Sequence, residues 1–330
     1  MASIILTILI STYPWPIRPF GSALQVSATL GDARESVADP RFHRGIDIPA
    51  SVGTTVYSII SDTARWDGSG VNTYVRVGNY WCIHLEDRRK GDSLVLGILD
   101  TINTPPDTIG KMLDYPNGDH LHFQIGPAGG PFENPLSRNG GPVGYNDTGS
   151  PTITIDFWRQ GSEGDTAQQL VGVLDGRVDI RACCQDTQTS GGVNNTSGIY
   201  KLTWSVDTVG PIQTIIFPQV QPPNNGDSVL LVYDRHNYRT ASPFYCWATN
   251  RIVNNQVEDR YWNTKQKDNQ PDSVDAESLE VARFKDCYYW VLVKAYDIRE
   301  NFDVAKDKET DRIQDDVSEL PSFDDVQKEV

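Results

Sequence analysis

His120-Leu121-His122-Phe123-Gln124-Ile125 is the stretch that decides how the first half of the chain folds. Its residues are typical of a β-strand, in which side chains at positions i and i+2 point the same way. The imidazoles of His120 and His122 are therefore expected to face one point in space. The chain has only five histidines in 330 residues, and two of them stand here. Two converging imidazoles are what a metal site needs from a β-scaffold.

A second cluster, His43-Arg44-Gly45-Ile46-Asp47, lies upstream and is followed by strand-like residues. A spacing of four is even, so His43 and Asp47 are expected to share a face near the start of a strand. Gly45 removes a side chain where the backbone must bend or approach another segment closely. Together with His122, the cluster offers the nitrogen and oxygen ligands of a catalytic zinc site. Neither cluster contains a cysteine, which argues against a structural zinc site.

The two motifs, H-x-G-x-D and then H-L-H-F, resemble those of the lysostaphin-type (LytM-like) zinc endopeptidases, which cut the peptides of bacterial cell walls. The similarity runs from about residue 26 to residue 136 and includes an entry strand at 27–34. The family also has a histidine in an H-L step between the motifs, and His84 matches it here. Four of the five histidines therefore fall on the four histidine positions of the family.

The resemblance implies a role for each residue. His43, Asp47 and His122 are expected to bind Zn²⁺, the one cofactor predicted. His120 is expected to act as the general base on the water molecule, and His84 to donate to the oxyanion or to relay a proton. The expected activity is that of a zinc metalloendopeptidase that hydrolyses the cross-links of peptidoglycan, or similar glycine-containing peptides.

Two other functions stay open. The first is a catalytically silent zinc-holding module that binds the wall or regulates another hydrolase. The second is an adhesion protein led by its second domain, with a residual peptidase fold. Taken singly, each histidine is as easily explained as a surface or core residue, so the enzyme interpretation depends on the set of four. Cys82, two residues before His84, is interpreted as a small buried hydrophobe.

The second half has short alternating strands separated by turn signals, which predicts a β-sandwich. The expected strands lie at 152–158, 177–182, 199–206, 229–233 and 288–297. The pattern G-x-V-D-I-x-A, ending in A-Y-D-x-x-E-N, resembles the immunoglobulin-like modules of secreted bacterial proteins. The predicted class is all-β: a small antiparallel metallopeptidase domain, similar to a duplicated hybrid motif, followed by an immunoglobulin-like β-sandwich. The expected divisions are 1–20 (signal segment or N-terminal arm), 21–142 (peptidase), 143–150 (linker), 151–302 (sandwich, with a polar insertion near 250–280) and 303–330 (acidic tail).

Composition limits the partners. A net charge of −15 disfavours nucleic acid and anionic lipid. The apolar run at 2–10 is too short to span a membrane and is either a signal segment or part of an ordered arm. Secretion, or a place in the periplasm or cell envelope, is expected mainly from the resemblance. The second domain is expected to bind the wall or a protein partner. The five cysteines allow a disulfide bond in the second domain or reduced thiols throughout.

Overall fold

The computed structural model describes residues 12–86, 98–102, 106–116, 118–137, 140–161, 168–171, 174, 176–206, 209–221, 226–253, 256–263 and 288–310. Within these ranges the chain is nearly all β-structure, arranged in several antiparallel sheets, as predicted. Helical turns are short: α1 spans Gly226–Leu230, and 3-10 turns span Gly70–Asn72 and Ser190–Gly192. Among these residues no helix is both long and apolar enough to cross a membrane.

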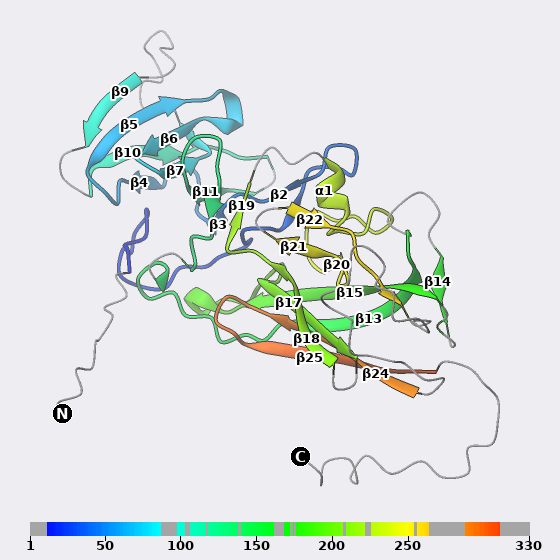
Figure 1. Ribbon diagram of the computed structural model, residues 1–330. Helices are drawn as coiled ribbons and strands as arrows, with labels where there is room; N and C mark the ends of the chain where they lie inside the picture. The colour runs from blue at the N-terminus through cyan, green and yellow to red at the C-terminus, as the bar shows by residue number, and fades with distance from the viewer. Residues whose placement is uncertain are drawn as a thin grey trace, which may run out of the picture.

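The first half forms a large sheet with a small sheet packed beside it (Figure 1). The large sheet runs in the order β19-β12-β11-β7-β6-β5-β9, and β3 pairs with β11 beside this path. The small sheet has the order β4-β10-β8, and β1 pairs with β2. The strands are β1 (Ala33–Arg34), β2 (Arg41–Phe42), β3 (Ile46–Pro49), β4 (Thr55–Tyr57), β5 (Asp62–Asp67), β6 (Tyr74–Val77), β7 (Tyr80–Ile83), β8 (Leu85–Glu86), β9 (Ile98–Ile102), β10 (Thr108–Met112), β11 (His120–Ile125), β12 (Phe132–Glu133) and β19 (Gln219–Val220).

Strand β11 is the centre of this half, because it pairs with β3 along one edge and with β7 along the other. Leu121, Phe123 and Ile125 are fully buried and point into the core, as the period of two predicts. The histidines of β11 therefore lie on the opposite face. The core behind the strand also contains Ile46 and Ile48 of β3.

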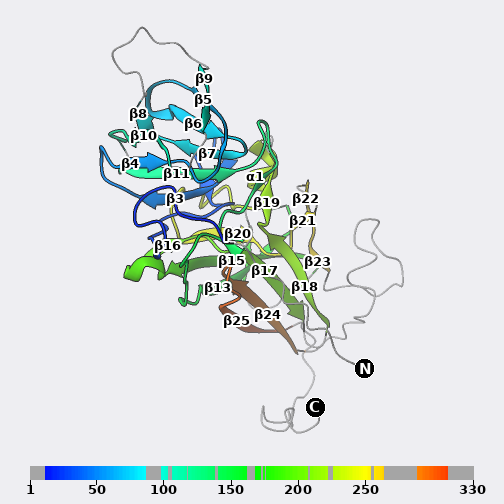
Figure 2. The same ribbon diagram turned by 90° about the vertical axis from the view of Figure 1, so that its left-hand side faces the viewer.

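The second half consists mainly of two antiparallel sheets that share one core (Figures 1 and 2). One has the order β14-β13-β15-β16, with β20 and β23 also paired to β15, and the other has the order β18-β17-β24-β25. Residues of both sheets, such as Ile180 and Val293, are fully buried in the shared cluster. The strands are β13 (Thr152–Arg159), β14 (Gln169–Leu170), β15 (Arg177–Gln188), β16 (Asn195–Ser197), β17 (Lys201–Val206), β18 (Val209–Ile216), β20 (Phe244–Trp247), β21 (Arg251–Val253), β22 (Gln256–Glu258), β23 (Trp262–Asn263), β24 (Tyr288–Tyr296) and β25 (Phe302–Thr310).

The two halves are joined through apolar packing as well as through the chain. Leu30, Phe42 and Phe132 belong to the core cluster of the second half although they come from the first. Strand β19 of the second half pairs with β12 and so extends the large sheet of the first. Strand β11, with His120 and His122, therefore lies in a sheet that both halves build.

The N-terminal residues that the structure describes are packed into the first half. Tyr13, Trp15 and Ile17 are buried in its core cluster, and Trp15 Nε1 donates a hydrogen bond to Val143 O at 2.8 Å. Residues 12–20 thus lie in the fold as an arm. The predicted signal segment otherwise falls on residues 1–11, outside the described residues.

The predicted strand at 229–233 is wrong. Residues 226–230 form α1, and Leu231 and Tyr233 continue the turn with backbone hydrogen bonds to Asp227 O and Val229 O. A short apolar run does not by itself distinguish a buried strand from a buried helical turn. Here Asp227 in the first turn favours the helix, because a carboxylate stabilises a helix N-terminus.

The C-terminal boundaries also differ from the prediction. Strand β25 spans Phe302–Thr310 and pairs along its length with β24, so the sheet continues into the predicted tail. The predicted insertion near 250–280 contains β21, β22 and β23 up to residue 263; residues 264–280 and the tail from 311 onward lie outside the described residues. The four described cysteines are free thiols, and Cys184 Sγ lies 3.9 Å from Cys246 Sγ. Cys287 lies outside the described residues.

Candidate metal centre

Two neighbouring strands place His122 directly opposite Asp47. The register of β11 against β3 pairs these residues, and directly opposed side chains project from the same face of a sheet. His122 Nδ1 lies 3.0 Å from Asp47 Oδ1. The contact follows from strand pairing alone and needs no loop to hold it.

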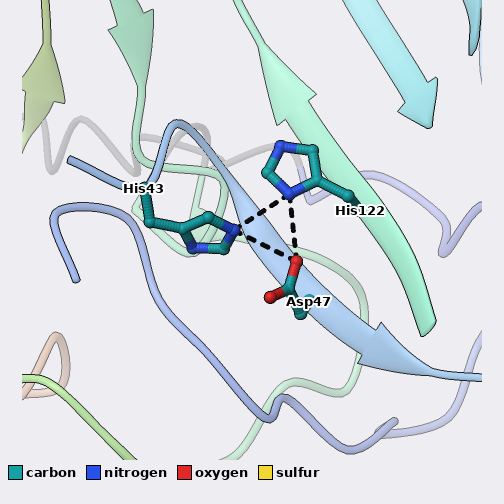
Figure 3. A group of neighbouring side chains, drawn as sticks. All are labelled: His43, Asp47 and His122. Atoms are coloured by element: carbon teal, nitrogen blue, oxygen red, sulfur yellow. Dashed lines mark hydrogen bonds and ion pairs between the residues drawn. The ribbon is translucent and has the colours of Figure 1, made fainter. Parts of the chain in front are cut away.

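His43 reaches the same point from the segment that joins β2 to β3. Its Nε2 lies 3.1 Å from Asp47 Oδ1 and 2.9 Å from His122 Nδ1. Figure 3 shows the two rings and the carboxylate converging from three positions on the backbone. A Cβ atom on Gly45 would meet Phe123 O at 2.3 Å, which confirms that this segment approaches β11 too closely for a side chain.

Each of the two rings makes a hydrogen bond through the nitrogen that points away from the centre. This bond determines whether the other nitrogen, which faces the centre, carries a proton or a lone pair. His43 Nδ1 lies 2.8 Å from Thr29 O, and a carbonyl oxygen only accepts, so Nδ1 donates. His122 Nε2 donates in the same way to Gln124 Oε1 at 3.1 Å. In the neutral rings the two inner nitrogens therefore carry lone pairs.

The centre thus brings two nitrogen lone pairs and one carboxylate oxygen to within 3.1 Å of one another. Three acceptors at such distances repel each other unless a cation or a proton lies among them. Zn–N and Zn–O bonds of about 2.0–2.2 Å in a tetrahedral arrangement place neighbouring donor atoms roughly 3.3 Å apart. The residues therefore fit a zinc ion with only a small outward shift of each donor.

The electrostatics of the centre keep the ligands in their binding forms. Burial, assisted by the charge of Arg34, lowers the pKa of His43 to about 3, so this ring is neutral at pH 7. Burial alone would raise the pKa of the Asp47 carboxyl, but charge and hydrogen bonds from His43 and His122, when these rings carry a proton on the side facing it, hold that pKa well below its usual value. A cation bound at the same point acts in the same direction. Asp47 is therefore an anion.

Arg34 holds the other oxygen of the same carboxylate. Its Nη2 lies 3.3 Å from Asp47 Oδ2 and 3.8 Å from Asp32 Oδ2, and its Nη1 donates to Thr240 O at 3.4 Å. Asp47 thus turns one oxygen to the guanidinium and the other to the histidines. Because Thr240 belongs to the second half, both halves of the chain fix this arrangement.

His84 enters the site from a bulge between β7 and β8. Its φ is +69°, a left-handed conformation that is uncommon for residues other than glycine. The backbone N–H groups of both His84 and Leu85 donate to Thr73 O, so two residues face one on the neighbouring strand. The bulge breaks the alternation that would have put His84 and Cys82 on one face. Cys82 is buried, as expected, and burial raises the pKa of its thiol to about 12.

His120 lies beside the group formed by His43, Asp47 and His122 but is not part of it. Its Nδ1 donates to Gly118 O at 2.7 Å, which leaves Nε2, 3.7 Å from Asp47 Oδ1, as the basic atom of the neutral ring. The rings of His84 and His120 lie 4.8 Å apart, and Tyr115 packs against both. Asp119 does not orient His120, because its Oδ1 accepts from Tyr115 N instead.

The structure therefore brings all five predicted residues together: His43, Asp47 and His122 in the ligand group, with His120 and His84 beside it. Sequence reasoning assigned no role to the outer partners, which are Thr29, Arg34, Gln124, Tyr115 and Val71. Arg34 and Gln124 stood inside stretches that the motifs singled out, so their positions were visible although their contacts were not. Tyr115 lies outside the motifs, so only the structure shows that it contacts the histidines.

Comparisons of the chain with protein-family models, with curated proteins and with solved structures found no match.

Proposed function

We propose that this protein is a zinc-dependent endopeptidase of the lysostaphin type, acting on peptidoglycan cross-links or similar glycine-containing peptides outside the cytoplasm. The proposed architecture is a small antiparallel β metallopeptidase domain followed by an immunoglobulin-like β-sandwich. The observation that carries the proposal is the convergence of His43 Nε2, His122 Nδ1 and Asp47 Oδ1, with two further imidazoles beside them.

His43, Asp47 and His122 would hold the ion. When bound, zinc acidifies a water molecule and polarises the scissile carbonyl. His120 is placed to take a proton at Nε2, because its Nδ1 is already engaged with Gly118 O and its Nε2 faces the centre.

His84 is better suited to relaying a proton than to donating to an oxyanion in its resting state. Its Nδ1 donates to Val71 O, and burial lowers its pKa to about 4. The resting ring is then neutral with no proton on Nε2. It becomes a donor there only after it has accepted a proton, for example from the neighbouring His120.

A cleft of about 650 Å³ supports a peptide-binding role for the junction between the halves. It is lined by residues 35–37 of the first half and by residues 235, 236 and 238–242 of the second, and it adjoins Arg34 through Glu35 and Thr240. Arg235, Arg239 and Glu35 give it charges of both signs, which suits the polar backbone and termini of a peptide.

The two histidines of β11 provide a matched pair of variants that tests the proposal. Purified full-length protein loaded with zinc should clear a peptidoglycan suspension. His120→Ala should lose this activity while it still binds one zinc ion, because it removes the base and no ligand. His122→Ala should lose both activity and zinc. Unchanged clearing by His120→Ala would exclude the base role, and full zinc content in His122→Ala would exclude the ligand set.

The low exposure of the ligands favours one alternative, the silent zinc-holding module. The side chains of His43, Asp47 and His122 are only 5–12% exposed. A site this closed would hold an ion well and admit a substrate poorly. One equivalent of bound zinc, with no hydrolysis of wall material or of glycine-rich peptides, would support this alternative over the enzyme.

A further inference from the structure

Three aspartates gather in the interior of the second half, far from the histidines in the sequence. Asp147 comes from the segment that links the halves, Asp186 from β15, and Asp297 from the turn after β24. One carboxylate oxygen of each lies within 4.8 Å of the others. All three residues are nearly inaccessible, at 3%, 1% and 1% exposure. The fold thus brings three separate segments together at one buried acidic point.

Two of the carboxylates are well supplied with hydrogen bonds. Asp147 Oδ1 accepts from the backbone of Gly149 and from both Thr189 N and Thr189 Oγ1. Asp297 Oδ1 accepts from the backbone N–H groups of Arg299 and Asn301, and its Oδ2 accepts from the Asn301 side chain. These contacts hold both groups in fixed orientations.

Asp186 is different. Its Oδ2 accepts a hydrogen bond from Gln188 Nε2, but its Oδ1 is buried and has no hydrogen-bond partner. A buried carboxylate oxygen without a partner is costly, and such atoms call for an ion or another ligand. This orphaned oxygen is an observation separate from the clustering of the acids.

Among the residues that the structure describes, no ion pair joins any of the three carboxylates to a lysine or arginine. Arg299 lies nearby, but its guanidinium stacks over the Tyr145 ring and donates to backbone carbonyls. Without a cation, burial and the charges of Asp147 and Asp297 raise the pKa of Asp186 to about 8.

We propose that Asp147, Asp186 and Asp297 form a calcium-binding site. All the converging atoms are carboxylate oxygens, which are the ligands that hard cations prefer. Zinc sites, in contrast, usually include nitrogen or sulfur ligands. Calcium accepts irregular all-protein oxygen cages, whereas magnesium requires near-octahedral geometry and keeps several waters. A site as buried as this one therefore favours calcium. Gln188 Oε1, which now accepts from Tyr145 at 2.8 Å, is a further neutral oxygen close by.

The position of the site in the fold indicates a structural role for a bound ion. Asp147 belongs to the link between the halves, and Tyr145 just before it is part of the first core. Asp186 belongs to β15 in one sheet of the second half, and Asp297 to the turn that joins β24 to β25 in the other. A bound ion would therefore fasten the link to both sheets. This site is independent of the zinc centre and of the proposed peptidase activity.

The test uses full-length protein freed of metal with a chelator that is then removed. Terbium, a calcium analogue, should give luminescence sensitised by Tyr145, whose hydroxyl lies 3.5 Å from Asp147 Oδ2. Calcium should displace terbium and raise the melting temperature, and magnesium at the same concentration should do so much less. Absence of both the luminescence and the melting shift in the wild type would overturn the proposal, and equal effects of the two ions would overturn the assignment to calcium.

Variants locate the binding. Asp186→Asn and Asp297→Asn should each weaken calcium binding at least tenfold. Asp179→Asn, a buried aspartate on the same strand but outside the cluster, should bind calcium like the wild type, and so should His122→Ala. Wild-type affinity in both cluster variants, or loss in His122→Ala, would contradict the site. If one cluster variant does not fold, the other and the wild-type titration still decide the question.

Discussion

Gln124 Oε1 lies 3.1 Å from His122 Nε2, two residues further along β11 and on the same face of that strand. The same period of two that aligns His120 with His122 therefore also supplies the group that orients the His122 ring. With Nε2 fixed as the donor, Nδ1 is left to face His43 and Asp47. The strand carries both a proposed ligand and its support.

Replacing Gln124 by Met should weaken zinc binding about 10- to 100-fold, because loss of an outer-sphere partner frees the ring and its tautomer. Competition with a chromophoric chelator measures the dissociation constant. Gln213→Met is a suitable control, since Gln213 is exposed on β18 of the second half. An unchanged affinity in Gln124→Met would mean that strand pairing alone orients His122.

The left-handed backbone at His84 predicts an unusual order of stability among its variants. The left-handed conformation costs an L-residue with a side chain roughly 1–2 kcal/mol of free energy, whereas glycine has no such cost. His84→Gly should therefore be more stable than His84→Ala by about 1 kcal/mol, the reverse of the usual order. Urea denaturation of the two variants measures the difference. A lower stability of the glycine variant would show that the bulge is not strained.

Trp15 tests whether the N-terminal arm is part of the mature fold. The side chain is fully buried and its indole N–H is bonded to Val143 O. Trp15→Ala should lower the free energy of unfolding by about 3–5 kcal/mol, the usual range for a buried tryptophan. Val171→Ala, at a position that is 86% exposed, should change it by less than about 0.5 kcal/mol. Full stability of a chain that starts at residue 21 would show that residues 12–20 are dispensable, as a cleaved signal would be.

Much of the candidate metal centre was predictable because it depends on local sequence patterns. The period of two in β11 and the close approach at Gly45 depend only on neighbouring residues, and both are seen in the structure. The pairing of β11 with β3, which puts His122 opposite Asp47, cannot be derived from the residues of either segment. Only the convergence of the two motifs on one metal site was predicted, and that prediction came from their resemblance to a known family.

Other features were not predictable because they depend on distant contacts. The run 229–233 became a helical turn whose Val229, Val232 and Tyr233 pack into the second core, so its apolar character alone did not distinguish a strand from a turn. Leu30 and Phe42 were assigned to the first half by position, but they pack into the second core. The aspartate cluster has no sequence spacing of its own, because its residues come from three separate segments that meet only in the folded chain.

The buried aspartates predict a pH dependence that distinguishes the calcium-free protein from Asp186→Asn. The pKa of Asp186 is about 8 in the folded chain, above its ordinary value of 3.8. The protonated form is thus the one that folding favours. Its stabilising effect is complete below pH 3.8 and is lost as the pH rises through 8. The pKa of Asp297, raised by burial to about 6, acts with the same sign.

Without calcium, the free energy of unfolding of the wild type should therefore fall relative to that of Asp186→Asn as the pH rises from about 4 to 8. The slope should be at most about 1.4 kcal/mol per pH unit for this group. The charges of Asp147 and Asp297, which face it, oppose its ionisation, and the nearby Tyr145 hydroxyl is neutral. The hydrogen bond from Gln188 favours ionisation but is outweighed by burial and by these charges. Saturating calcium should flatten the wild-type curve, because the ion stabilises the ionised carboxylates. Urea denaturation of both proteins across this pH range gives the comparison, and parallel curves without calcium would show that Asp186 is not held protonated by its surroundings.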